Sequence, residues 1–489
     1  MGCGLRRTIA NPLSPVQKTN RFAREMFMLL YCGAARYKLR APNMKNSSCR
    51  ATYLCRLAAS FLSFLACLVT SALAQPAKGV SKYIGPGSCS ATACHGGVQP
   101  RSVTSVLQNE YSIWVVQDSH SKAFRSLQNP VTQRMGRILG IAKPENSPKC
   151  LACHALAVSA QMKGRDFDVS DGVSCESCHG PASAWLGPHT TKGFARQQSV
   201  ALGMYDTSDL VRRSEKCLSC HLGTPDKEVD HQMIAAGHPD LVFELDSYSA
   251  IMPPHWKPPQ DPNHGARAWS VGQAVKLREA LNRLSRRTRG ENWPEYAELD
   301  CFSCHHSLTK PENSWRQERG YENRSPGAPP WNVAHFAVFR ILAKDVNPEA
   351  SERLEKELAT IYKLTAQSDA SRKDIDASAK RGSEAAIQLL QQVNALQFDR
   401  ARTARLLGAI AADAEHIADN DTRTAEQAAM ALDALFISYS SQAGKNTSVR
   451  AAIDGLFQQL DNPSAYNAPR FKAQMQRVAA ALKEAGIER

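Results

Sequence analysis

Apolar residues recur at every third or fourth position through the last third of the chain. Glu384–Val393 and Ala401–Ile410 show this spacing clearly, which places the apolar side chains along one face of a helix. From about residue 336 onward there is no cysteine, while Ala, Leu, Glu, Arg and Gln are abundant. The pattern predicts a helical C-terminal domain over residues 336–489, a bundle or cap of about five helices.

Short polar or glycine-containing stretches predict where these helices are interrupted. The interruptions are expected near residues 345–347, 368–371, 420–421, 444–446 and 462–463. His416 lies in this region without a cysteine partner, and we expect it to be solvated.

A second apolar pattern is a continuous run near the N-terminus. Residues 58–74 are mostly apolar, end in the small-residue site Ala72-Leu-Ala74 and follow several basic residues, as a secretory signal does. We therefore assign residues 44–74 to a signal peptide that is cleaved before Gln75, and we predict a periplasmic protein. If the leader were retained, it would anchor the chain to a membrane.

The residues before this signal are interpreted as an over-extended start. Met44 stands at the usual distance upstream of the apolar run, so residues 1–43 need not belong to the protein. A genuine long leader is the alternative.

Residues 75–335 are marked by cysteine pairs that end in Cys-His. The chain has 15 cysteines, of which five lie in the leader and ten in these pairs. Four pairs have the spacing C-x-x-C-H: Cys150, Cys153 and His154; Cys175, Cys178 and His179; Cys217, Cys220 and His221; Cys301, Cys304 and His305. This is the attachment motif of a c-type haem, because two thiols bond the porphyrin edge and the following imidazole binds the iron. A single motif would also fit a zinc or redox site, and disulfides are allowed in this compartment, but neither requires a histidine after every pair.

The first pair departs from this spacing. Cys89 and Cys94 are separated by four residues before His95, so two additional small residues must bulge out if both sulfurs are to reach one haem. We interpret it as a fifth covalent haem. Attachment through Cys94 alone and a plain disulfide are the alternatives, and the count falls to four haems if this site is not used.

Further histidines of this region are candidates for the opposite face of each iron. The first choices are His120, His189, His238 and His255. His120 follows Asp118 and Ser119, either of which can cap a helix. His189 follows Gly180-Pro181, which ends an attachment turn, and His238 and His255 lie beside prolines that restrict the backbone. His231 and His306 are second choices, and His264 and His335 are expected to face solvent.

Several segments resemble the cytochrome c-554 family over residues of about 80–335. The resemblance rests on Tyr83-Ile-Gly85 with Cys89–His95, Tyr111-x-x-Trp114 with Ser119–Ala123, Cys175–Pro181 with His189, Ala236–Leu241, and Asp300–His306. It implies a periplasmic electron carrier with mostly bis-histidine, low-spin haems in stacked pairs, and the name-giving member keeps one five-coordinate haem. His120 and His189 match distal ligands of that family. This chain departs from it by a fifth motif and a haem-free tail.

The positive charge is distributed unevenly along the chain. The formal charge is +14, but residues 1–74 hold eleven Lys and Arg against one Glu, a balance of +10 that leaves +4 for the remainder. Since haem propionates would add negative charge, we expect no nucleic-acid partner. With 43% hydrophobic and 22% charged residues, wholesale disorder and a polytopic membrane protein are both excluded.

These observations predict a mainly α fold, with a pentahaem domain over residues 75–335 followed by the helical domain. The expected function is electron transfer between a protein donor and a protein acceptor, rather than catalysis; no catalytic residue is assigned. The alternative is an oxidoreductase that acts on a small nitrogen or sulfur species at a five-coordinate haem. Residues 336–489 are expected to dock a partner, mediate oligomerisation, cover a haem or act only as a stabilising lid.

Overall fold

The computed structural model describes residues 80–305, 329–462 and 465–487. The predicted signal peptide, the interpreted extension over residues 1–43 and the candidate ligand His306 lie outside these ranges. The described residues form α-helices, 3₁₀ turns and connecting loops, with three isolated β-bridges and no strand among them. The predicted mainly α class is confirmed.

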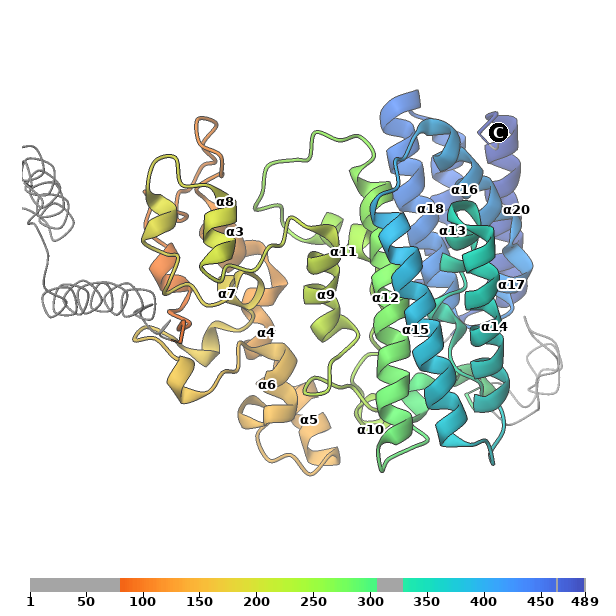
Figure 1. The fold of residues 1–489 in the computed structure, drawn as a ribbon, viewed down its shortest axis with the longest axis horizontal. Coiled ribbons are helices and arrows are strands. Elements are labelled where there is room, and N and C mark those ends of the chain that lie inside the picture. Colours follow the sequence, from red (N-terminus) through yellow and green to blue (C-terminus); the bar gives the residue numbers. More distant parts are fainter. Residues whose placement is uncertain (1–79, 306–328, 463–464, 488–489) are drawn as a thin grey trace, which may run out of the picture. The chain divides into compact units, whose positions relative to one another are not determined.

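The part that carries the cysteine motifs is built from short helices joined by long loops (Figure 1). The helices are α3 (Glu110–Gln117), α4 (Ala123–Ser126), α5 (Pro130–Ile138), α6 (Pro148–His154), α7 (Cys175–His179), α8 (Arg196–Ala201), α9 (Leu210–His221), α10 (His231–Ala235) and α11 (Leu245–Ile251). Three of them, α6, α7 and α9, end at the histidine of an attachment motif. One helical turn places the two cysteines of such a motif on one face, so the helix presents both thiols together.

A long helix, α12 (His264–Arg289), links this part to the C-terminal bundle. It lies before the predicted boundary at residue 335, yet it packs against α15 of the bundle as well as against α9 and α11. Most of its residues are buried, among them Trp269 and Leu277. The basic residues Lys276, Arg283 and Arg287 are buried together with these apolar side chains, so α12 forms a shared wall of the two regions.

The C-terminal region contains more helices than the sequence predicted. The described residues after 336 form α13 (Phe339–Val346), α14 (Pro348–Thr365), α15 (Arg372–Asn394), α16 (Arg400–Ala412), α17 (Ala414–Ala418), α18 (Thr422–Ala443), α19 (Thr447–Gln458) and α20 (Ala468–Glu484). The expectation of about five was wrong. Four of the five predicted interruptions lie at or beside a helix boundary of the structure, and residue 462 lies between α19 and α20. The interruptions at residues 395–399 and at Asp413 were not foreseen. Asp399 caps α16 by accepting a hydrogen bond from the Arg402 backbone N–H at 2.7 Å, whereas the neighbouring Leu396 and Phe398 resemble a continued apolar face.

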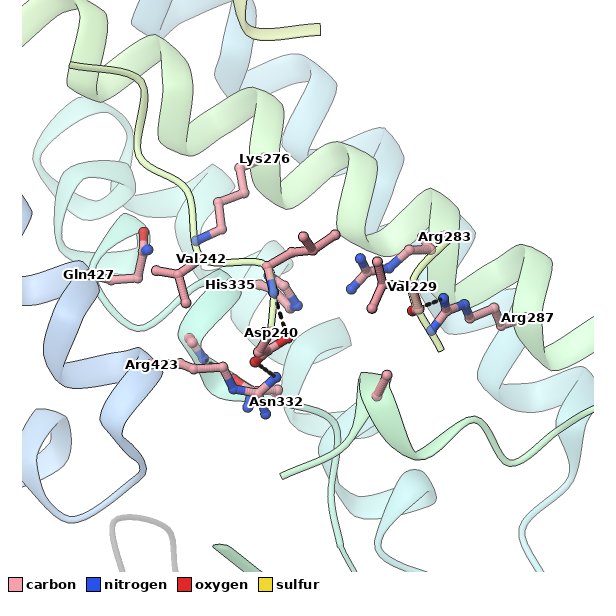
Figure 2. Close-up of a pocket in the computed structure, with 13 residues that line it drawn as sticks. Val229, Asp240, Val242, Lys276, Arg283, Arg287, Asn332, His335, Arg423 and Gln427 are labelled. Carbon is pink, nitrogen blue, oxygen red and sulfur yellow. Dashed lines mark hydrogen bonds and ion pairs between the residues drawn. The ribbon is translucent and has the colours of Figure 1, made fainter. Parts of the chain in front are cut away.

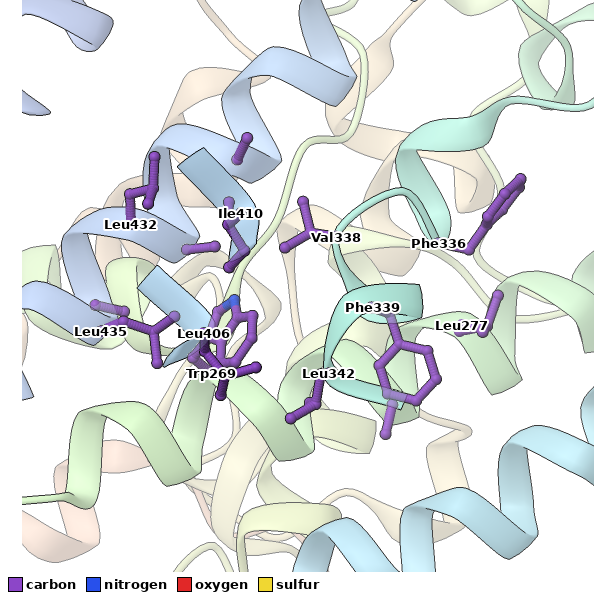
Figure 3. Close-up of a cluster of buried hydrophobic side chains, with 14 of the residues drawn as sticks. Trp269, Leu277, Phe336, Val338, Phe339, Leu342, Leu406, Ile410, Leu432 and Leu435 are labelled. Atoms are coloured by element: carbon purple, nitrogen blue, oxygen red, sulfur yellow. The ribbon is translucent and has the colours of Figure 1, made fainter. Parts of the chain in front are cut away.

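The bundle has one hydrophobic core to which α12 contributes. Trp269 of α12, Phe339 of α13, Leu406 of α16 and Leu435 of α18 belong to it and are almost completely buried (Figure 3). Burial of each such side chain contributes roughly 1.5–3 kcal/mol. The bundle core therefore fixes the positions of α12 and α18, including the side chains on the faces of these helices that point away from the core.

Candidate haem-binding sites

Four of the five motif histidines have a second imidazole opposite them. The ring centroids of each pair are 6.3 or 6.4 Å apart: His95 with His189, His221 with His120, His154 with His238, and His305 with His231. In every pair the second histidine comes from a different segment of the chain. The partners include three of the four first-choice candidates and one second choice.

The separation of these rings fits an iron between them. Two metal–nitrogen bonds of about 2 Å each, together with the distance from each nitrogen to its ring centre, give a spacing of this size. The interplanar angles vary from 7° to 90° while the separation stays almost constant. Direct ring packing would couple distance to orientation, so the constant spacing indicates room for an axially ligated metal.

Most of these rings are held through Nδ1, which leaves Nε2 free for the iron. The acceptors are Glu110 for His95 (2.8 Å), Asp118 for His120 (2.9 Å), the Ala123 carbonyl for His154 (3.1 Å), the Leu186 carbonyl for His189 (2.5 Å) and the Pro239 carbonyl for His238 (2.7 Å). Metal-bound histidines generally donate their other ring N–H in this way, which sets the tautomer and the ring orientation. The residues present therefore fit axial ligation of haem.

His120 shows how a local cap positions one of these rings. Asp118 precedes the turn and accepts a hydrogen bond from the His120 backbone N–H at 2.9 Å, in addition to the ring contact. The hydrogen bond to Asp118 raises the pKa of His120, although burial opposes the shift. The Val173 N–H donates to the His120 carbonyl at 3.1 Å, and Trp114 donates from Nε1 to the Val173 carbonyl at 3.0 Å, so a second segment holds the backbone of this turn.

His179 differs from the other motif histidines. It has no imidazole in ring contact among the described residues, and burial lowers its pKa to about 4, with a smaller contribution from His255. His255 lies close enough for that electrostatic effect, but its ring contacts Trp256, with centroids 4.8 Å apart, and its Nδ1 lies 3.3 Å from the Pro253 carbonyl. Gly180, with a φ of 77°, ends α7 directly after His179, a conformation that favours glycine.

The thiols of different motifs come together in an interleaved order. The neighbouring Cys175 thiol lowers the pKa of Cys89, which places the first motif beside the third. The neighbouring Cys153 thiol is the main reason that the pKa of Cys220 is lowered, which places the second motif beside the fourth. All ten described cysteines are free thiols, as attachment of a porphyrin requires.

The additional residues of the first motif fold into a compact turn. The Cys94 N–H donates to the Ala91 carbonyl at 2.8 Å, and the His95 N–H donates to the Cys89 carbonyl at 3.2 Å. The bulge is thus closed by its own backbone, and the motif keeps both thiols and its imidazole in one short segment.

Arginines of the bundle bind the backbone of the motif-bearing loops. Arg283 donates to the Leu222 carbonyl at 2.5 Å, directly after His221, and Arg287 donates to the Val229 carbonyl at 2.9 Å. Arg423 donates to the Leu299 carbonyl at 3.0 Å, and its Nη2 lies 3.3 Å from Cys301 Sγ. Sequence reasoning missed these residues; the one available signal was the i, i+4 spacing of the first two, which puts them on one helix face.

The expectation that His335 faces solvent was wrong. Its side chain is buried, with 8% exposed, and its ring lies 5.4 Å from that of Trp331. Trp331 and Phe336, which contain aromatic rings and lie close to His335 in the sequence, are core residues of the bundle. His335 is therefore buried beside them. His264, at the start of α12, is half-buried, and His416 is exposed.

The part of the chain that the structure describes contains no cluster of three or more His, Cys, Asp or Glu side chains suited to a bare metal ion. Within the same residues, no helix combines the length and the apolar character needed to cross a membrane.

One family model matches the chain. Residues 89–180 match the family described as cytochrome c554 and c-prime, and this stretch contains the first three attachment motifs. No curated protein and no solved structure matches the chain significantly.

Proposed function

Because the chain is a c-type cytochrome that resembles the cytochrome c554 family over residues 89–180, we propose that it transfers electrons between protein partners through closely packed, mostly bis-histidine haems. The observation that carries this proposal is the set of four imidazole pairs at 6.3–6.4 Å. Bis-histidine ligation closes both faces of an iron, so such a group exchanges electrons and leaves no position for a substrate.

Five haems would be held by the ten cysteines of the motifs. The chain's own contribution would be to anchor each porphyrin edge through two thiols, to present the Nε2 atoms of the axial histidines to the iron and to hold most of their Nδ1 atoms on acceptors. When bound, the haems supply reversible one-electron chemistry.

The interleaved thiols support a route for the electrons. Contact of the first motif with the third, and of the second with the fourth, would bring these haems edge to edge or face to face within each pair. Since electron tunnelling weakens steeply with distance, neighbouring haems in such pairs exchange electrons fastest.

His179 carries the second candidate function. Its lack of an opposing imidazole among the described residues favours a five-coordinate iron at the third motif, where a small nitrogen or sulfur species would bind and be reduced or oxidised. Ligation by His255 is the competing arrangement, and it would leave the chain a pure electron carrier.

The protein would act in the periplasm, where c-type cytochromes of this kind meet protein donors and acceptors. Residues 336–489, together with α12, would stabilise the haem region through the arginine contacts described above and offer a surface for docking or oligomerisation.

Electron paramagnetic resonance and mass spectrometry test these proposals together. We expect the mature chain to carry the mass of five covalently attached haems, and a count of four would contradict the use of Cys89 and Cys94. Five low-spin signals would exclude the enzymatic alternative. A high-spin signal that changes on adding nitrite, hydroxylamine or nitric oxide would establish it instead.

A further inference from the structure

A small cavity lies between α12, α18 and the segments that contain residues 229–242 and 331–335 (Figure 2). Its lining is strongly cationic. Lys276, Arg283 and Arg287 of α12 and Arg423 of α18 carry positive charge, whereas Asp240 is the sole carboxylate among the lining residues.

The three arginines already have partners. Arg283 and Arg287 both pair with the buried Glu298, at 2.6 and 2.9 Å, and Arg287 has Glu228 at 3.7 Å. These contacts hold the guanidinium groups in place at the cavity wall.

Arg423 is held in the same manner from the other side. It pairs with Asp240 at 2.9 Å and with Asp421 at 3.1 Å. Two carboxylates therefore compensate this one cation, and the arginines together are close to neutralised.

Lys276 has no direct contact of this kind. Its side chain is buried, with 5% exposed, and no described residue gives it a hydrogen bond or an ion pair within 4 Å. Glu244 and Asp240 are close enough to act on it electrostatically. The Glu244 oxygens, however, accept hydrogen bonds from the backbone N–H groups of Asp246 and Ser247, and Asp240 pairs with Arg423. Burial lowers the pKa of Lys276 to about 7, because a buried ammonium without a bonded partner is costly, and a bound anion would favour its charged form.

His335 provides a second unpartnered polar group in the same cavity. Its Nδ1 is buried and has no hydrogen-bond partner among the described residues. Burial lowers its pKa well below the usual range, so the ring is neutral and can donate one N–H. Buried polar atoms without partners are uncommon in folded proteins and call for an explanation.

We propose that this cavity is an anion-binding site, in which Lys276 and His335 hold a carboxylate or a small oxyanion. The arginines, which their own carboxylates neutralise, shape the wall of the site. Its position suits a redox protein, because Arg423 reaches from the cavity to within 3.3 Å of Cys301 Sγ in the fifth motif, and Val229 lies two residues before His231.

The same chemistry has two sources. One is a propionate of the haem attached at Cys301 and Cys304, which rests on the function proposed above. The other is a free oxyanion from solution, such as nitrite or sulfite, which does not.

The test compares the purified holoprotein with the variants Lys276→Met and His335→Gln. Arg289→Gln is the matched control, because it removes a positive charge from the exposed end of the same helix. Isothermal titration calorimetry with sodium nitrite and with sodium sulfite measures the free anion. A redox titration and the propionate bands in resonance Raman spectra report on the haem.

A free oxyanion would bind the native protein one to one, and each cavity variant would weaken its binding at least tenfold, with the control unchanged. A bound propionate would leave the native protein unable to bind either salt, while Lys276→Met shifts the propionate band and lowers the potential of one haem. The proposal is overturned if neither salt binds and neither the band nor any potential changes. The haem mass of the same samples separates this failure from loss of the fifth haem.

Discussion

The imidazole rings of His95 and His189 lie parallel, with centroids 6.3 Å apart and 7° between their planes. His95 belongs to the first attachment motif, and His189 follows the third. Each ring is also held at Nδ1, by Glu110 and by the Leu186 carbonyl. Two distant segments therefore build this pair together, and in the proposed bis-histidine site it would hold one iron.

Replacing His189 with alanine removes one side of this pair. We expect one low-spin haem to become high-spin, because no other described imidazole lies in ring contact with His95, while the covalent haem content stays constant. Paramagnetic resonance and visible spectra measure the change. His416→Ala is the control, since that ring is exposed and has no second imidazole opposite it; an unaltered spectrum in His189→Ala would refute the pairing.

The carboxylate of Asp118 is expected to tune the fourth haem through His120. Asp118→Asn keeps an oxygen that can cap the turn but removes the charge that makes the imidazole a stronger donor to iron. A weaker donor stabilises ferric iron less, so the potential of one haem should rise. Redox titration tests this, and Asp413→Asn, which alters the equivalent contact of the exposed His416, should leave every potential in place. If the haem potentials are the same in both variants, Asp118 does not tune this haem.

Glu298 should be important for stability because it is fully buried between two arginines. Glu298→Gln leaves both guanidinium groups without a buried counter-charge, which costs about 3–5 kcal/mol in comparable pairs. Chemical denaturation measures the free energy of unfolding. Glu349→Gln breaks an exposed pair with Arg353 on α14 and should cost about 0.3–0.5 kcal/mol. If the two variants lose similar stability, the buried network does not have this role.

Stability should also depend on the ionisation of Glu426. Burial, followed by the charges of Asp421 and Asp240, raises its pKa to about 7 against the opposing effects of Arg423 and Lys276. Because the folded pKa lies above the unfolded value of 4.5, the folded state holds the proton more tightly. The resulting stabilisation is complete below pH 4.5 and is lost as the pH rises through about 7.

Glu426→Gln imitates the protonated form at every pH. We expect it to raise the melting temperature at pH 8 and to change it little at pH 5. Asp246, whose pKa burial also raises to about 7, leaves a residual slope in both proteins. The exposed Glu355 on α14 is the comparison, and the idea fails if Glu355→Gln and Glu426→Gln respond identically to pH.

The sequence alone determined the features that depend on neighbouring residues. Two thiols and an imidazole within five positions form an attachment motif whatever surrounds them, and the α6, α7 and α9 helices end at these histidines. The mainly α class follows equally from local periodicity. Most helix breaks could also be predicted from the sequence. The interruption before Asp399 could not, because apolar residues there continue the helical pattern.

Only the tertiary structure decided which imidazoles face each other. His231 was only a second-choice ligand candidate from the sequence, yet it lies opposite His305. His255 was a first choice, but it has no motif histidine in ring contact within the described residues. Such pairing depends on how loops from distant positions pack, and no local pattern encodes it. Burial of Lys276 and His335 in a cationic cavity has the same origin, because α12, α18 and the loop before α13 create it by packing together.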